Sequence, residues 1–297
     1  MKSEKAKALL LGTLIGDAIT LGVHWIYDTN ELATEAGDFT GYIDPVAGSA
    51  KYHPNRKAGE QTHYGDQFLV LVESIRENRG FYLSDFARRW QDLFDGYDDY
   101  VDGATKKTLA NLKSGAAASD AGSDSDELAA VSRVAAIVAA YPDASIGELQ
   151  EIAWSAVSFT HGNPVLKGAS EFFIRVLKAV EDGKSIEEAL SVAASVDYDT
   201  LDAAAQLASA KAVQELEAVE AIGKLGQSCH FKDAFPATLY ILLRYGNDPE
   251  RALLENAKAG GDSAARSLLA GAVLAAKHGI GAFPQSWFDG LKASTLI

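Results

Sequence analysis

The chain is poor in cysteine, methionine and positive charge. It has one cysteine and one methionine, and its 27 lysines and arginines are outnumbered by 41 aspartates and glutamates, for a formal net charge of -14. An acidic surface repels phosphate backbones, so we expect no nucleic-acid partner. Cys229 alone cannot form an internal disulfide, which fits a reducing cytoplasm, and we therefore expect a cytoplasmic protein.

Long uninterrupted apolar runs are also missing. No stretch reaches the roughly 18 apolar residues that a membrane span requires, so we expect a soluble protein with no membrane partner. An apolar run near the N-terminus, Ala8–Ile15, is followed by Asp17 and His24 and not by a small-residue cleavage pattern. This run predicts a buried helix rather than a signal peptide.

What the chain does have is apolar residues at helical spacing along most of its length. Alternating β-type patterning is nearly absent, and 47% of the residues are hydrophobic, enough for a large core. The sequence therefore predicts an all-α protein with residues 1–297 in a single domain. The helical segments predicted after position 66 are Phe68–Ile75, Phe81–Tyr97, Leu128–Tyr141, Ile146–Phe159, Leu166–Glu181, Ile186–Ala194, Leu201–Leu216, Phe235–Tyr245, Arg251–Ala259 and Ser267–His278.

Two segments look irregular. Residues 37–66 are rich in glycine and proline, and so long a loop inside a compact domain is usually functional or mobile. Residues 114–127, which read SGAAASDAGSDSDE, are small and acidic and indicate a flexible connection. The chain beyond this segment has no composition of its own, so we expect no domain boundary there.

Two aspartates beside glycines are candidates for chemistry. Asp17 interrupts an apolar helical run, where a carboxylate is costly unless it is paired or bound to a cation. It can equally cap a neighbouring helix. Asp66 follows Gly65 near the predicted start of a helix. It serves there either as a plain N-cap or as an oxygen ligand for a hard cation such as Mg²⁺.

Residues 260–266, which read GGDSAAR, form a third candidate. Gly260 and Gly261 allow close approach of the backbone to a ligand, and Asp262 is placed to cap a helix that begins at Ser263. The N-terminus of that helix also favours anions such as phosphate. A Gly-Gly turn followed by an aspartate cap explains the same residues.

His161 is a fourth candidate, at the end of a predicted helix. It is either a pocket residue or part of an ordinary helix stop, because Gly162 and Pro164 follow it. Cys229 next to His230 suggests a nucleophile–base pair, but adjacent side chains on a helix do not face each other.

For two further sets of residues we expect a structural role and no part in binding or catalysis. The acidic cluster does not match a calcium-binding EF-hand loop and predicts a solvated face; it consists of Asp95, Asp98, Asp99 and Asp102. The tryptophans are predicted to be core residues; they are Trp25, Trp90, Trp154 and Trp287.

Taken in order, these motifs resemble the ADP-ribosylglycohydrolase family from about Leu9 to about Trp287. The opening GTLIGDAITLGVHW is similar to the family's first aspartate motif, and THGNP at 160–164 to its Thr-His motif. FKDAFPA at 231–237 resembles the helix that leads into the last site, and GGDSAARSLLAGAVLAA the Gly-Gly-Asp motif. The resemblance implies a compact all-helical fold with a central acidic cleft. In active members this cleft holds two magnesium ions beside ADP-ribose, whose distal N- or O-glycosidic bond is hydrolysed.

The chain departs from the family pattern at the metal ligands. The family has Thr-Asp-Asp-Thr where residues 64–67 read Tyr-Gly-Asp-Gln. In the late motif Asp262 is kept and Ser263 can stand for a threonine, but the second aspartate and the following threonine are both alanine. Of four metal-site aspartates only Asp66 and Asp262 remain. This variation resembles the branch of the family that contains the J1 crystallins.

Charge counting predicts at most one magnesium ion. Two close ions need more negative charge than Asp66 and Asp262 offer to offset their repulsion, whereas one ion with bound waters needs only one or two carboxylates. Arg266 lies one helical turn past Asp262. We expect it to point into the cleft and to replace a metal charge by bridging carboxylates or holding a phosphate.

We therefore expect a hydrolase of a glycosidic bond in an ADP-ribosyl or related nucleoside-type substrate. The expected catalytic residues are Asp66, Asp262 and Asp17, with Asp66 and Asp262 also as ligands of a single magnesium ion. The alternative is an inactive family member that binds a nucleotide-like ligand or has a structural, crystallin-like role. The residues expected to bind substrate are His161, Gly260, Gly261, Ser263, Arg266, Tyr64 and Gln67. The sequence makes no prediction of the oligomeric state.

Overall fold

The computed structural model describes residues 3–296 of the chain. Within that range the protein is built from α-helices and short 3₁₀ helices, with isolated β-bridges in place of a sheet, which confirms the predicted all-α class. The helices up to the middle of the chain are α1 (Glu4–Leu21), α2 (Thr29–Ala36), α3 (Ala47–Ala50), α4 (His63–Asn78), α5 (Leu83–Phe94), α6 (Gly103–Lys113), η1 (Ala118–Asp120), η2 (Leu128–Ser132), α7 (Arg133–Ala140) and α8 (Ile146–Ser158). The remaining helices are α9 (Pro164–Glu181), α10 (Ile186–Ala194), α11 (Ala203–Ala212), α12 (Ala218–Leu225), α13 (Phe231–Tyr245), α14 (Pro249–Lys258), α15 (Ser263–His278), η3 (Ile280–Ala282), α16 (Gln285–Gly290) and η4 (Lys292–Leu296).

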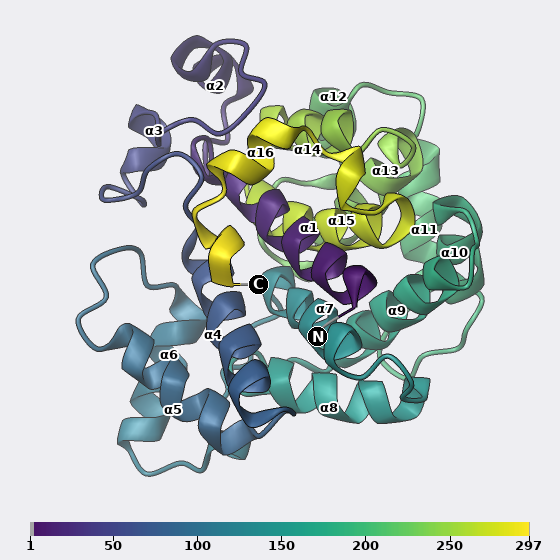
Figure 1. The fold of residues 1–297 in the computed structure, drawn as a ribbon. Helices are drawn as coiled ribbons and strands as arrows, with labels where there is room; N and C mark the ends of the chain where they lie inside the picture. The colour runs from purple at the N-terminus through teal and green to yellow at the C-terminus, as the bar shows by residue number, and fades with distance from the viewer. Residues whose placement is uncertain (1–2, 297) are drawn as a thin grey trace.

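Helices α1 and α15 pack against each other at the centre of the molecule (Figure 1). Glycines allow this contact, since a Cβ at Gly16 would lie 2.1 Å from the carbonyl oxygen of Ser267. A Cβ at Gly271 would likewise lie 2.1 Å from the carbonyl oxygen of Gly12. The two helices are therefore antiparallel, and the C-terminal end of α1 lies beside the N-terminal end of α15. This arrangement brings together two motifs that are far apart in the sequence.

Substitution of Gly16 tests this close contact. In Gly16→Ala the new methyl group overlaps the backbone of α15, so we expect a loss of about 1–3 kcal/mol of stability, as for other overpacked interiors. The matched control is Gly223→Ala in α12, where a Cβ meets nothing within 4 Å. There alanine should stabilise by about 0.5–1 kcal/mol through helix propensity. Urea unfolding of both variants measures the contrast, and equal changes would argue against the contact.

The helix boundaries differ from the sequence prediction in a few places. Helix α4 begins at His63 and is capped by the side chain of Thr62, so the predicted start near Asp66 was three residues late. The predicted segment Leu128–Tyr141 begins with a 3₁₀ helix, and the segment Leu201–Leu216 shortens to α11. Helices α2, α3, α6, α12 and α16 were not predicted.

The acidic segment 114–127 is tied to the rest of the chain rather than loose. The backbone N–H of Ser123 donates to the carbonyl oxygen of Thr160 (2.9 Å), and the N–H of Gly162 donates to that of Ser123 (2.7 Å). The prediction of a flexible connection was therefore wrong, because the end of α8 offers this segment a backbone partner that its composition does not reveal.

The tryptophans divide between core and partly exposed positions. Trp90 and Trp287 are almost fully buried, as predicted, whereas Trp25 and Trp154 are only partly buried. No helix within residues 3–296 combines the length and the hydropathy that a membrane span needs.

Candidate functional site

Asp262 lies at the N-terminus of α15 and is fully buried. Its carboxylate accepts hydrogen bonds from the phenol of Tyr64 (2.9 Å) and from the backbone N–H of Ala265 (3.0 Å). Nε2 of His24 lies 3.1 Å from the same carboxylate. Burial would raise the pKa of Asp262, but these neighbours, His24 foremost, hold it well below its usual range. Asp262 is therefore an anion whose oxygens are already engaged by the protein.

A buried pair of histidines continues from Asp262. Nδ1 of His24 lies 2.9 Å from Nε2 of His53, and Nδ1 of His53 lies 3.2 Å from Oδ2 of Asp99. These contacts place both rings in one line between the carboxylates of Asp262 and Asp99. Burial lowers the pKa of His24, while ionised Asp262 acts in the opposite direction.

Arg56 extends this line of contacts to Asp66. Its Nε donates to Oδ2 of Asp99 and its Nη2 donates to Oδ2 of Asp66, both at 2.5 Å. The phenol of Tyr97 also donates to Asp66 (2.6 Å). Burial raises the pKa of Asp66 to about 6, against the opposing effect of Arg56 and Tyr97. The described residues place no direct hydrogen bond between Asp66 and Asp262. A line of contacts through Arg56, Asp99, His53 and His24 connects these two predicted metal ligands.

Asp17 lies near the end of α1 and holds the start of α4. Its two carboxylate oxygens accept the backbone N–H and the hydroxyl of Thr62, each at 2.7 Å. Gly65 leaves room for this contact, because a Cβ there would lie 2.3 Å from Oδ2 of Asp17 and 2.5 Å from Oε1 of Gln61. These contacts give Asp17 a structural role, and its predicted catalytic role stays a prediction.

The protonation of Asp17 can be tested through stability. Burial raises its pKa to about 7, against the opposing hydrogen bonds from Thr62. Between the unfolded pKa of 3.8 and about 7, the folded chain holds a proton that the unfolded chain has lost, so stability falls as pH rises. Relative to Asp17→Asn, wild-type stability should fall by about 1.4 kcal/mol per pH unit in that window. Urea unfolding at several pH values measures this difference, and a constant difference would contradict a buried neutral carboxyl group.

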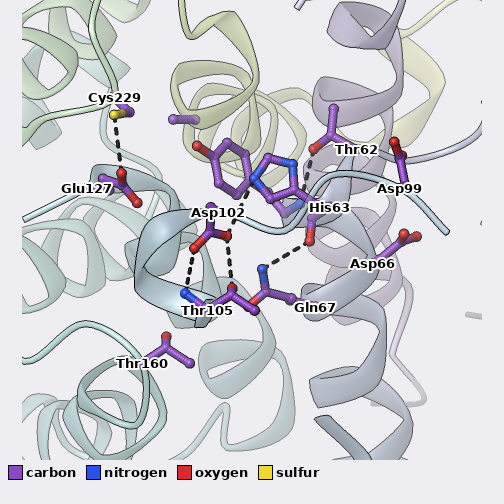
Figure 2. A network of polar contacts seen from close by, with 12 residues as sticks. Thr62, His63, Asp66, Gln67, Asp99, Asp102, Thr105, Glu127, Thr160 and Cys229 are labelled. Atoms are coloured by element: carbon purple, nitrogen blue, oxygen red, sulfur yellow. Dashed lines mark hydrogen bonds and ion pairs between the residues drawn. The ribbon is translucent and has the colours of Figure 1, made fainter. Parts of the chain in front are cut away.

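A second group of acidic side chains surrounds Tyr64. Asp102 is the N-cap of α6, and its Oδ2 lies 3.5 Å from Nε2 of His63. Glu127 comes directly before η2 and is 17% exposed. After burial itself, Asp262, Glu127 and Asp102 all help to raise the pKa of the Tyr64 phenol. Figure 2 shows His63 and Asp102 pointing toward one another, with Glu127 on the far side of Asp102 from the helix that carries Asp66.

Several buried polar atoms in this group have no hydrogen-bond partner among the described residues. They are both ring nitrogens of His63, Oε2 of Glu127 and Nε2 of His161, and the last two atoms lie 3.4 Å apart. A small cavity of about 10 Å³, room for about one water, is lined in part by Tyr64, Gln67 and His161. Leaving such atoms unpaired costs about 1–3 kcal/mol each. Water, an ion or a ligand in this place would complete their hydrogen bonds.

Partly exposed aromatic side chains lie next to these atoms. Trp25, Tyr52 and Tyr100 meet edge to face, with ring centroids 4.7–5.6 Å apart. Tyr100 also contacts the ring of His63. Trp25 has a left-handed backbone (φ 63°), which is held by its N–H donating to the carbonyl oxygen of Gly261 (3.0 Å). Rings placed this way offer apolar surfaces against which a base or a sugar can stack.

The acidic cluster between α5 and α6 is not the solvated face that the sequence predicted. The side chain of Asp99 is fully buried and that of Asp102 is 4% exposed, while the other two aspartates of the cluster are exposed. Asp99 faces His53, and Asp102 faces His63. The prediction failed for these two because their partners come from distant parts of the chain.

Gly260 and Gly261 make room for the chain itself. Both have left-handed φ angles, of 72° and 65°. A Cβ at Gly260 would lie 2.6 Å from the carbonyl oxygen of Ile26, and one at Gly261 would lie 2.3 Å from that of Gln227. This tight turn delivers Asp262 to the start of α15. Contact of the two glycines with substrate stays a prediction.

The guanidinium of Arg266 bonds to uncharged partners rather than to carboxylates. It is fully buried, and its Nε donates to Oδ1 of Asn256 while its Nη2 donates to the carbonyl oxygen of Gly260, both at 2.6 Å. The expectation that it bridges carboxylates was wrong, because this side chain instead secures the loop before Asp262. Burial lowers the pKa of Arg266 to about 10. Its contact with a phosphate stays a prediction.

Gln67 is engaged at both ends of its amide. Its Oε1 accepts from Nε1 of Trp90 (2.8 Å) and from Nη2 of Arg133 (3.2 Å), and its Nε2 donates to the carbonyl oxygen of His63 (3.1 Å). Gln67 thus ties α4 to α5 and α7. The hydroxyl of Ser263 is buried without a partner among the described residues. Substrate binding by these two residues stays a prediction.

Cys229 and His230 do not form a nucleophile–base pair. The thiol of Cys229 faces Glu127 and the ring of His230 faces Asp126. Burial raises the pKa of the Cys229 thiol, which removes its thiolate at neutral pH.

These contacts bear on the predicted magnesium site. Asp66 faces a guanidinium and a phenol, and Asp262 faces an imidazole, a phenol and a backbone N–H. Within residues 3–296 no three His, Cys, Asp or Glu side chains are grouped to hold a metal. The residues therefore do not fit a preformed magnesium centre. A single ion at Asp66 and Asp262 stays a prediction.

Comparison with known proteins decides the family. The family profile described as ADP-ribosylglycohydrolase matches residues 1–297. The chain belongs to the ADP-ribosylglycohydrolase family. This confirms the resemblance drawn from the ordered motifs and covers the whole chain.

Relatives of this ADP-ribosylglycohydrolase family member include an uncharacterized protein of Archaeoglobus fulgidus, 30% identical over 97% of this chain and 92% of that protein. Crystallins J1A and J1B of Tripedalia cystophora are 25% and 26% identical over 96% of this chain and 91% of each crystallin. A solved structure described as an ADP-ribosylglycohydrolase-related protein complex matches with a TM-score of 0.69 and 21% identity, over 99% of this chain and 95% of that chain. The structural match shows a shared all-α fold.

At two positions where the ADP-ribosylglycohydrolase pattern has aspartates, this chain has no suitable space for an aspartate side chain. Gly65 has no space for a side chain beside Asp17. Ala264 is fully buried in an apolar cluster with Tyr64 and Leu268. A carboxylate at position 264 would be buried among apolar groups without a hydrogen-bond partner, which costs on the order of several kcal/mol. Gly65 and Ala264 are therefore packed into the surrounding interior, so restoring either aspartate would require neighbouring residues to change as well.

Sequence reasoning missed several residues of this site. His53 and Arg56 lie in the glycine- and proline-rich segment 37–66, so the length of that loop was the available signal. Glu127 is the last residue of the acidic segment 114–127, and no sequence feature distinguished it from the other acidic residues there. His24 stands only a few residues beyond Asp17, within the first motif.

Proposed function

We propose that this chain hydrolyses an N- or O-glycosidic bond of an ADP-ribosyl or related nucleoside-type substrate with its own carboxylates and without a preformed two-metal centre. Membership of the ADP-ribosylglycohydrolase family supports the class of reaction. Such hydrolysis passes through an oxocarbenium-like transition state, which nearby carboxylates stabilise. Asp102, Glu127 and Asp262 all lie near Tyr64 and supply that negative charge.

The observation that carries this proposal is the state of Glu127. It is 17% exposed, whereas Asp102 is 4% exposed and Asp262 is fully buried, so it is the most solvent-accessible of these carboxylates. Its Oε2 is buried, has no hydrogen-bond partner among the described residues, and lies within ion-pair distance (3.4 Å) of Nε2 of His161. A carboxylate that lies beside an imidazole at the edge of a buried polar site suits a general acid or base.

The other residues take supporting roles in this proposal. Asp262, held ionised by its donors, provides a fixed negative charge. The rings of Trp25, Tyr52 and Tyr100 provide apolar faces for the base or the ribose. Glu127 activates the attacking water or protonates the leaving group. His161 keeps the substrate-binding role predicted from the sequence, next to Glu127.

A substrate panel tests the proposal. The wild-type chain is incubated with ADP-ribosylated arginine, an ADP-ribosylated serine peptide and an O-acyl ADP-ribose, with EDTA or with magnesium, and released ADP-ribose is measured by chromatography. We expect release from at least one substrate in EDTA. No release from any substrate under either condition would overturn the proposal, and release only with magnesium would overturn its metal-free part.

One observation favours a second candidate, a family member that binds a nucleotide-like ligand or has a crystallin-like structural role without turnover. The carboxylates of Asp66 and Asp262 are engaged by Arg56, His24 and Tyr64 of the chain itself. Binding of ADP-ribose without hydrolysis of any substrate in the panel would select the ligand-binding form of this candidate.

A further inference from the structure

Arg56 lies between carboxylates that come from two different segments. Asp66 is in the first turn of α4, and Asp99 is in the segment between α5 and α6. The guanidinium donates through Nε to Asp99 and through Nη2 to Asp66 and to the phenol of Tyr97. Its charge centre also lies 5.5 Å from the centre of the Tyr97 ring. The guanidinium of Arg56 thus links the loop after α3 to the first turn of α4 and to the segment between α5 and α6.

The surroundings make this cation a fixed part of the structure. The side chain of Asp99 is fully buried, and those of Arg56 and Asp66 are 16% and 15% exposed. A guanidinium keeps its charge in proteins and holds carboxylates through several directed N–H groups. Removing one partner from such a buried arrangement leaves a carboxylate without compensation. The fully buried side chain of Asp99 in particular has no contact with solvent that could replace the guanidinium.

We propose that Arg56 is a built-in cation that takes over charge neutralisation at Asp66 from a divalent ion. A hard cation and a guanidinium meet the same need, which is positive charge between carboxylate oxygens. The ion exchanges with solvent, whereas Arg56 is covalently part of the chain. Because Arg56 already balances the charges of Asp66 and Asp99, these two carboxylates need no magnesium ion. The guanidinium also occupies the position at Asp66 where a metal ion would bind. This holds whether or not the chain hydrolyses a substrate.

Substitution of Arg56 should therefore open a metal site that the wild type lacks. We expect no saturable Mn²⁺ binding by the wild-type chain, measured by the loss of the free Mn²⁺ signal in electron paramagnetic resonance, and no change of its Tm in millimolar MgCl₂. In Arg56→Gln, Asp66 and Asp99 lose their cation. The variant should have a lower Tm that MgCl₂ partly restores, and should bind Mn²⁺ saturably, because two carboxylates are then open to a hard cation. The double variant Arg56→Gln/Asp66→Asn should lose that binding.

Two controls separate this effect from general charge removal. Arg56→Lys keeps the positive charge and should stay insensitive to both metals. Arg244 also lies between two carboxylates, Glu215 and Glu217, but these are 89% and 66% exposed, so Arg244→Gln should gain no metal affinity.

Two results would overturn the proposal. One is saturable Mn²⁺ binding by the wild type that Asp66→Asn abolishes. The other is a folded Arg56→Gln variant with unchanged Mn²⁺ affinity. If Arg56→Gln cannot be purified, the Mn²⁺ titrations of the wild type and of Arg56→Lys still decide, since binding by either one that Asp66→Asn abolishes contradicts a cation that already neutralises Asp66.

Discussion

Replacing Glu127 by glutamine should lower kcat for the preferred ADP-ribosyl substrate by about 10²–10⁴, the range that general acid–base groups contribute. Glutamine has the shape of glutamate but cannot exchange a proton. The side chain makes few close contacts, since the thiol of Cys229 lies 3.5 Å from Oε1 and Nε2 of His161 lies 3.4 Å from Oε2. KM and unfolding midpoint should therefore change little, and steady-state kinetics with urea unfolding separates the two effects.

Glu215→Gln is the matched control for Glu127. Its side chain is 89% exposed and forms an ion pair with Arg244 at 3.5 Å. The same loss of one negative charge at the surface should leave kcat unchanged. Wild-type kcat in Glu127→Gln would show that another group handles the proton, and would remove Glu127 from the mechanism.

Asp262→Asn should destabilise the folded chain by about 3–5 kcal/mol, the cost of breaking a buried charged pair. An asparagine oxygen cannot replace a carboxylate that faces Tyr64, Ala265 and His24 at once. The pKa of Asp262 is lowered by folding, so this carboxylate contributes stability that is present at neutral pH and is lost only as the solution becomes acidic. The deficit of the variant should therefore be largest near pH 7 and shrink in acid.

Asp202→Asn is the control for a helix cap without buried partners. Asp202 caps α11 through the N–H of Ala205 (2.9 Å) and is exposed. Asparagine is about as good an N-cap as aspartate, so this change should stay within about 0.5 kcal/mol. Urea unfolding of both variants at pH 7 gives the comparison. A similar small effect in both would show that Asp262 is only a cap.

The fold was predictable because its signals are local. Helical spacing of apolar residues predicted α8, α9 and α10 to within two residues, since each has an apolar face and clear caps. The start of α4 was missed because Thr62 rather than Asp66 is the cap, and both residue types are good caps. Short helices such as α3 lack the length over which a period can be read.

The site was predictable only in part because its contacts are not local. Asp17, Asp66 and Asp262 stood out beside their glycines, but the partners that give them their roles come from other segments. His24 and Asp262 are 238 positions apart, and His53 and Asp99 are 46 positions apart. No spacing rule connects residues at such distances. A long glycine-rich loop marked the region that contains His53, although not its role.

Calorimetric titration of ADP-ribose into the wild-type chain in EDTA tests the central claim most directly. That claim is a metal-independent site for an ADP-ribosyl group, built from the carboxylates around Tyr64 and the neighbouring aromatic rings. We predict saturable binding at one site, with weaker affinity in Tyr100→Ala. No heat of binding at millimolar ADP-ribose, or binding that develops only after magnesium is added, would contradict it.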